Sequence, residues 1–61
     1  MNGDALKKLL REEGLSQNEL ARRMGVSTAH MSNVINGRRE ARVDLLKRIC
    51  IMFRRDPKEL W

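Results

Sequence analysis

Residues 15–37 read LSQNELARRMGVSTAHMSNVING, and this stretch decides the fold. Ser16 and Glu19 have the spacing of a capping box, in which each side chain accepts a hydrogen bond from the other residue's backbone amide. The spacing predicts a helix from there to Gly25. Ser27 is predicted to cap a second helix that runs to the end of the stretch. Only the three residues from Gly25 to Ser27 separate the two predicted helices.

Small and apolar residues in this stretch occur where two crossing helices require them. Ala21 is small where the second helix must pass over the first, and Gly25 tolerates the left-handed backbone of a tight turn. Apolar residues also occupy the inward-facing positions, namely Leu20, Met24, Val26, Met31 and Val34. The pattern predicts a helix-turn-helix over about residues 17–36. An ordinary helical hairpin with the same core is the alternative.

The rest of the chain is also predicted to be helical. Asn2 is a predicted N-cap for a helix that ends at Glu13, and apolar residues at helical spacing mark another helix over residues 45–53. Asp56-Pro57 is typical of a helix start, so a fifth helix is expected there. No alternation of period two occurs, and the sequence therefore predicts a compact all-α domain of five helices over residues 1–61.

Length and cysteine content narrow the possible classes of protein. The chain has 61 residues, one cysteine and one histidine, so it cannot form an intrachain disulfide or a four-ligand zinc site. No metal, cofactor or small-molecule substrate is expected, and the lone His30 and Cys50 supply no catalytic triad. Cys50 lies on an apolar stripe and is predicted to be a core residue. A free cysteine fits the reducing cytoplasm.

The charge of the chain is concentrated in its centre. The formal net charge is +5, and residues 22–55 hold nine Lys and Arg residues against two acidic ones. A basic block of this kind indicates a polyanionic partner such as nucleic acid, although a solvated basic face is the alternative. No apolar run is long enough to span a membrane, and the N-terminus lacks the apolar segment of a signal peptide.

Several motifs resemble the lambda-repressor-like (Cro or XRE-type) DNA-binding domain. The resemblance lies in residues 15–21, in Met24-Gly25-Val26-Ser27, in residues 34–39, and in the segments around Leu45 and Asp56, and it covers residues 5–60. It implies a five-helix domain that binds operator DNA as a dimer. Ala41-Arg42 departs from the Pro-Ser common in the family, so the fourth helix is expected to lack its usual cap. We also expect any dimerisation element beyond Trp61 to be absent.

A helical wheel of residues 28–36 gives candidate DNA-contacting residues. Short polar side chains gather opposite the apolar side, and such side chains can approach base edges in the major groove. The expected base-reading residues are Thr28, Ala29, Ser32 and Asn33. Residues expected to contact phosphate, some of them only through the resemblance, are Gln17, Ser27, His30, Asn36, Arg38, Arg39 and Arg42. For Asn36 a local turn-capping role is the alternative.

The C-terminal apolar residues are the candidates for self-association. This apolar set consists of Ile51, Phe53, Leu60 and Trp61, which are the residues expected at a dimer interface. Part of the set must also close the core, and the surplus is expected to form the dimer patch. The sequence thus predicts a cytoplasmic, double-stranded DNA-binding transcriptional regulator, a repressor of phage or bacterial type that binds a palindromic operator as a homodimer. A protein-interaction module, such as an antitoxin-like partner of another protein, is the alternative. A basic membrane-binding helix is a distant third.

Overall fold

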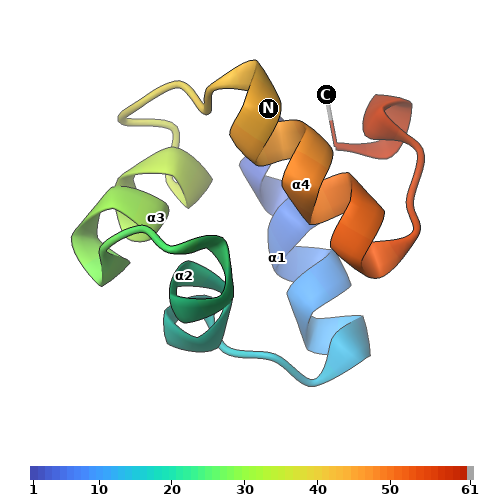
Figure 1. Cartoon of the computed structure of the whole chain (residues 1–61), viewed down its shortest axis with the longest axis horizontal. Helices are drawn as coiled ribbons and strands as arrows, with labels where there is room; N and C mark the ends of the chain where they lie inside the picture. The colour runs from blue at the N-terminus through green and yellow to red at the C-terminus, as the bar shows by residue number, and fades with distance from the viewer. Residues whose placement is uncertain (61) are drawn as a thin grey trace.

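The computed structural model describes residues 1–60, which form four α-helices and one short 3₁₀ helix (Figure 1). No β-strand occurs among these residues, so the all-α prediction is confirmed. The elements, in chain order, are α1 (Gly3–Glu13), α2 (Gln17–Met24), α3 (Thr28–Ile35), α4 (Val43–Phe53) and the 3₁₀ helix η1 (Pro57–Glu59). In Figure 1, α2 and α3 lie on one side of the molecule and η1 lies on the other, with α1 and α4 between them.

The predicted fifth helix is wrong, because only one 3₁₀ turn forms there. Asp56 caps this turn as expected, accepting a hydrogen bond from the Lys58 amide at 2.9 Å. The chain then turns at Leu60, whose side chain is buried in the core. The Leu60 carbonyl accepts a hydrogen bond from the Asn2 amide at 2.6 Å. These tertiary contacts, and not further helical turns, fix the segment against the core.

The predicted helix caps are confirmed. Asn2, Ser16 and Ser27 each accept, on the side-chain oxygen, a hydrogen bond from the backbone amide three residues later, at 3.0 to 3.1 Å. Glu19 completes the capping box by accepting from the Ser16 amide at 3.4 Å. Arg42 precedes α4 and makes no side-chain cap, as its departure from the family pattern implied. Local hydrogen bonds therefore fix where the first three helices begin.

One hydrophobic core joins all the helices. The side chains of Leu6, Leu20, Ala21, Met31 and Ile49 are fully buried within it. The remaining buried members of the cluster are Leu9, Leu10, Met24, Ile35, Leu45, Leu46, Cys50 and Leu60. No helix among residues 1–60 has the length and hydropathy that crossing a bilayer requires.

Cys50 is a buried core residue, as the sequence predicted. Burial raises the pKa of its thiol, and the nearby carboxylates of Asp56 and Glu59 raise it further. The thiol therefore stays protonated at neutral pH and is a poor nucleophile. This chemistry is consistent with a packing role for the only cysteine of the chain.

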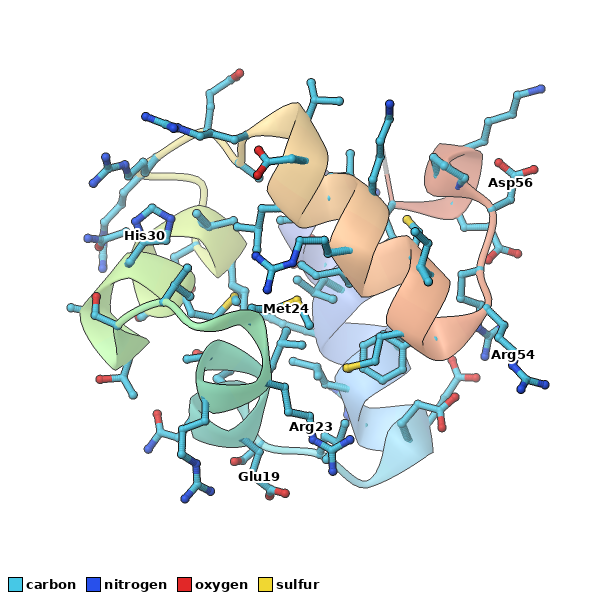
Figure 2. The ribbon with its side chains drawn as sticks, viewed as in Figure 1. Glu19, Arg23, Met24, His30, Arg54 and Asp56 are labelled. Atoms are coloured by element: carbon cyan, nitrogen blue, oxygen red, sulfur yellow. The ribbon has the colours of Figure 1, made fainter. Side chains whose placement is uncertain are left out.

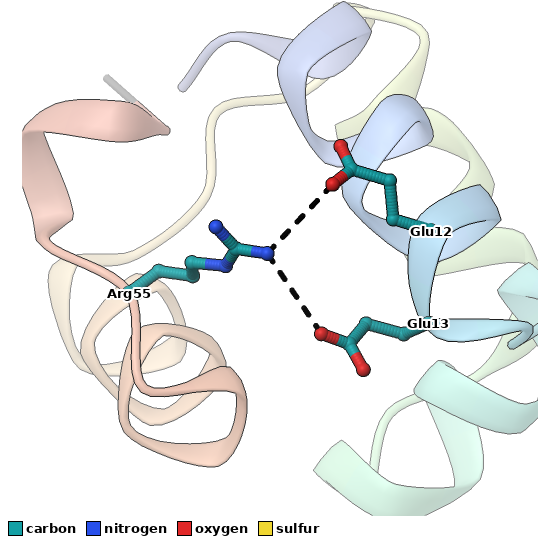
Figure 3. Close-up of polar contacts among 3 residues, drawn as sticks. All are labelled: Glu12, Glu13 and Arg55. Carbon is teal, nitrogen blue, oxygen red and sulfur yellow. Dashed lines mark ion pairs between the residues drawn. The ribbon is translucent and has the colours of Figure 1, made fainter.

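A surface ion pair connects the end of α1 to the segment after α4. The guanidinium of Arg55 lies 3.8 Å from a carboxylate oxygen of Glu12 and 3.9 Å from one of Glu13 (Figure 3). The two carboxylates occupy the negative end of the α1 dipole, where anions are unfavourable, and the arginine offsets their charge. All three side chains are solvent-accessible, so each pair contributes at most about 1 kcal/mol.

Gly3 allows the start of α1 to approach the end of α3 closely. A Cβ atom at this position would overlap the carbonyl oxygen of Ile35, which belongs to the backbone and cannot move aside as a flexible side chain would. The contact brings the start of α1 against Ile35, the last residue of α3. Glycine is required here because there is no room for a side chain, and not because of an unusual backbone conformation.

Gly3→Ala is expected to lower the free energy of unfolding by about 1–3 kcal/mol, because the added methyl group forces α1 and α3 apart. Urea unfolding followed by circular dichroism measures the loss. Lys8→Ala, a change at an exposed position of the same helix, should stay within about 0.5 kcal/mol of the wild type. Equal stability of the two variants would show that the close approach is unimportant.

Candidate nucleic-acid interface

The connection between α2 and α3 is a three-residue turn. Gly25 ends α2 in the left-handed conformation, with φ of 71°, and Ser27 caps α3 two residues later. Between them, the Val26 amide donates to the Ala21 carbonyl at 3.0 Å. The Val26 side chain packs against the core. The predicted helix-turn-helix geometry is therefore present, and α3 leaves the turn on the outer side of the molecule (Figure 1).

The two sides of α3 differ as the helical wheel predicted. Met31, Val34 and Ile35 are buried. Thr28 and Ala29 are exposed, and the side chains of Ser32, Asn33 and His30 are partly exposed. The outer side is short and polar, and α3 contains neither lysine nor arginine. Such a surface can bring hydroxyl, amide and methyl groups close to a partner without long charged side chains in between.

Asn33 and Asn36 differ in how far their side chains are already engaged. Within residues 1–60, the Asn33 amide group has no hydrogen-bond partner, so its donors and acceptor are available. The Asn36 Nδ2 group donates to the Ser32 carbonyl at 2.9 Å and lies 3.3 Å from the Ser32 hydroxyl. This local bond is the capping role given above as the alternative for Asn36. A phosphate contact by the same amide would compete with that bond.

A hollow between the turn and α4 brings together several of the predicted phosphate-contacting residues. It measures about 250 Å³. His30, whose position on α3 Figure 2 shows, lines it together with Arg39 and Arg42 from the following loop. Its other lining residues are Val26, Asp44, Leu45 and Arg48. Arg38 is exposed in the same loop but does not line the hollow. The site can therefore hold an anion against several positive side chains beside α3.

A second basic hollow lies at the start of α2, and two of its residues are not among those predicted from the sequence. It measures about 310 Å³ and contains the expected phosphate-contacting residue Gln17 together with Lys7 and Arg11 of α1. A helix N-terminus favours anions, and these two cations strengthen that preference. Lys7 and Arg11 were overlooked because the first 21 residues are slightly acidic overall. Their spacing of four residues, which places both on one side of a helix, is the signal that could have identified them.

A family model for helix-turn-helix domains matches residues 6–60, almost the whole chain. The chain belongs to the Cro/XRE-type helix-turn-helix family. This helix-turn-helix protein accordingly binds DNA, and its family is not enzymatic. Searches of curated proteins and of solved structures find no match. Residues 1–60 contain no group of three His, Cys, Asp or Glu side chains that could hold a metal ion.

The residues expected at a dimer interface differ in their exposure in this helix-turn-helix domain. Ile51 is 76% exposed on α4, the highest exposure among the large apolar side chains described. Phe53 is half-buried and packs against the core. Leu60 is only 2% exposed, so its side chain closes the core and is not available to a partner. Trp61 lies outside the described residues. The expected patch is thereby reduced, among residues 1–60, to Ile51 and the edge of Phe53.

Removing both cations beside the start of α2 should weaken binding to all DNA sequences. In Lys7→Ala/Arg11→Ala, we expect the slope of log affinity against log salt to become shallower by up to about 2, roughly 0.9 for each lost phosphate contact. The slope is measured by fluorescence anisotropy with a random duplex. The double variant Lys8→Ala/Lys58→Ala removes the same charge from exposed positions that do not line this hollow. Equal slopes for the two double variants would rule out a specific contact.

Proposed function

We propose that this chain is a sequence-specific transcriptional regulator that inserts α3 into the major groove of double-stranded DNA. The observation that carries the proposal is the charge pattern around α3. Its outer side is short, polar and free of lysine and arginine, while basic hollows lie beside it and at the start of α2. Positive charge at the flanks provides affinity for phosphate, and neutral side chains between them distinguish bases.

Asn33 is the main candidate for base recognition. Its free side-chain amide can form a bidentate pair with adenine. Thr28 offers a hydroxyl and a methyl group, and Ala29 offers a methyl group that suits thymine. Both are exposed at the start of α3, where the helix would first enter the groove. Ser32 is a weaker candidate, since its hydroxyl oxygen lies 3.3 Å from the Asn36 amide.

The phosphate contacts are proposed on both sides of the recognition helix α3. Gln17 would bind phosphate with the free amides of the α2 N-terminus, next to Lys7 and Arg11. On the other side, phosphate contacts are assigned to His30, Arg38, Arg39 and Arg42. The Ser27 hydroxyl accepts a bond from the His30 amide and keeps its own proton for a phosphate oxygen. Asn36 would bind a phosphate only after its hydrogen bonds to Ser32 have broken.

The size of the domain supports a dimer on an operator with two half-sites. The longest dimension of the Cα trace is 25 Å. Half-sites on successive turns of DNA are about 34 Å apart, so one domain can place only one recognition helix. Two copies related by a twofold axis would read a palindromic operator, and a repressor of phage or bacterial type acting in the cytoplasm is the role we propose. Ile51, Phe53 and Trp61 are the candidate dimer contacts.

A protein-interaction role is the second candidate function. The observation that favours it is the exposure of Ile51, which the core leaves uncovered and which would form a contact surface together with further apolar neighbours. An antitoxin-like domain would use this side chain to hold another protein. Specific DNA recognition would then be lacking, and the two candidates make opposite predictions for base preference.

Asn33→Ala and Arg38→Ala should affect DNA binding differently. We expect Asn33→Ala to cost about 1–3 kcal/mol at one base pair and to relax the preference there. Arg38→Ala should weaken all duplexes alike and reduce the salt slope by about 1. Competition binding against a panel of single-base variants measures the base preference, and repeating it at several salt concentrations measures the slope. Base preferences that survive Asn33→Ala unchanged would refute its recognition role.

Selection of bound sequences from a random duplex pool tests the proposal as a whole. The expected result is a palindrome with two half-sites about one helical turn apart. Ile51→Asp should keep the half-site preference but lose joint occupancy of the two half-sites, because it places a charge in the proposed dimer contact. Enrichment of no sequence would overturn the proposed function and favour the protein-interaction role.

A further inference from the structure

Arg48 connects α4 to the end of α2. Its Nη2 group donates a hydrogen bond to the Met24 carbonyl at 2.9 Å, and the bond is partly buried. Met24 is the last residue of α2, and it lies at the centre of the view in Figure 2. The bond joins residues that are 24 positions apart in the chain. It is therefore a tertiary contact that no local sequence pattern indicates.

The Met24 carbonyl needs such a partner because of its place in the helix. The last four carbonyls of an α-helix have no amide in the next turn to bind. The Ala21 and Arg22 carbonyls accept from the Gly25 amide, which follows the helix. The Met24 carbonyl instead accepts from a cation, which also suits the negative end of the helix dipole. This single side chain thus satisfies a carbonyl at the point where the turn begins.

We propose that Arg48 is a positioning residue for base recognition, a role that rests on the proposed function of α3. Three residues after Met24, Ser27 caps α3 and sets the direction of its first turn. Because Arg48 of α4 holds the Met24 carbonyl, it fixes the point at which the turn starts. The position of this turn then determines where Thr28 and Ala29 lie. Since α4 directly follows the arginine loop, which is formed by residues 36–42, the same bond fixes the recognition helix relative to Arg39 and Arg42.

The surroundings of Arg48 support this role. Its side chain lines the hollow that also contains His30 of α3 and Arg42 at the start of α4. Arg48 therefore shares this hollow with the recognition helix and with Arg42, whose spacing must stay fixed to match a DNA groove. With one guanidinium nitrogen bound to Met24, Arg48 acts on recognition through the turn. A direct phosphate ligand would instead affect all DNA sequences equally.

The test uses the sequence enriched by selection and a random duplex. Arg48→Met keeps the aliphatic stem and removes the donors, and we expect the affinity ratio between the two duplexes to fall by about tenfold. Arg48→Lys retains a cationic donor and should recover most of the ratio. Ile49→Val, a core change in α4 that lowers stability but keeps the Arg48 guanidinium and its donors, is the matched control and should leave the ratio unchanged. All measurements are made at a temperature at which circular dichroism shows each variant to be folded.

Two results would overturn the proposal. One is an unchanged ratio in Arg48→Met, and the other is an equal loss of affinity for both duplexes with a shallower salt slope, which would identify a phosphate ligand. If Arg48→Met does not fold, Arg48→Leu, which also lacks side-chain donors, takes its place with the same expected loss.

Amide hydrogen exchange in the free protein separates this proposal from the proposed function. Arg48→Met should accelerate exchange at residues 25–31 relative to α1, whether or not the wild type prefers any DNA sequence. A wild type without sequence preference would refute base recognition alone. Unchanged exchange at residues 25–31 would refute the positioning role.

Discussion

The left-handed backbone at Gly25 is the constraint on which the rest of the structure depends. It ends α2 and leaves only Val26 before the N-cap of α3, so the two helices must cross at close range. The fully buried Ala21, whose carbonyl binds the Val26 amide, makes this crossing possible. Any residue with a Cβ atom at Gly25 would pay the steric cost of this conformation. This one turn therefore sets where α3 begins relative to α2.

The charges of the molecule are separated in space more sharply than in sequence. On α1, Lys7 and Arg11 lie by the start of α2, whereas Glu12 and Glu13 face Arg55 on the other side of the helix end (Figure 3). A segment that is slightly acidic overall therefore still contributes positive charge next to the helix-turn-helix. The neutral outer side of α3 lies between this region and the arginine loop. Net charge alone could not have indicated such an arrangement.

Sequence reasoning succeeded where the controlling interactions are local. The caps at Asn2, Ser16 and Ser27 each act over three residues, so their spacing alone was enough to predict where the helices begin. It failed at the proposed fifth helix, because the contacts of Leu60 with Asn2 and the core come from the far end of the chain.

In the candidate site, too, features set by local sequence were predicted and features set by helix packing were not. The polar side of α3 follows from helical periodicity, and the structure places it as predicted. The basic hollow with Lys7 and Arg11 and the bond from Arg48 to Met24 depend on how helices pack, and no pattern within one helix reveals them. Asn36 was the intermediate case, since both of its alternatives were recognised and its bonds to Ser32 support the local one.

Helix α3 has little stability of its own. An isolated helix of eight residues is not stable in water, so the orientation of α3 must come from its contacts. Its inner side is buried, its last residue meets α1 at Gly3, and the turn before it is held through Met24 by α4. Contacts at both ends therefore determine where the outer side chains lie. Under the proposed function, substitutions that never touch DNA would therefore change which bases the domain prefers, and stability and recognition would be coupled in so small a domain.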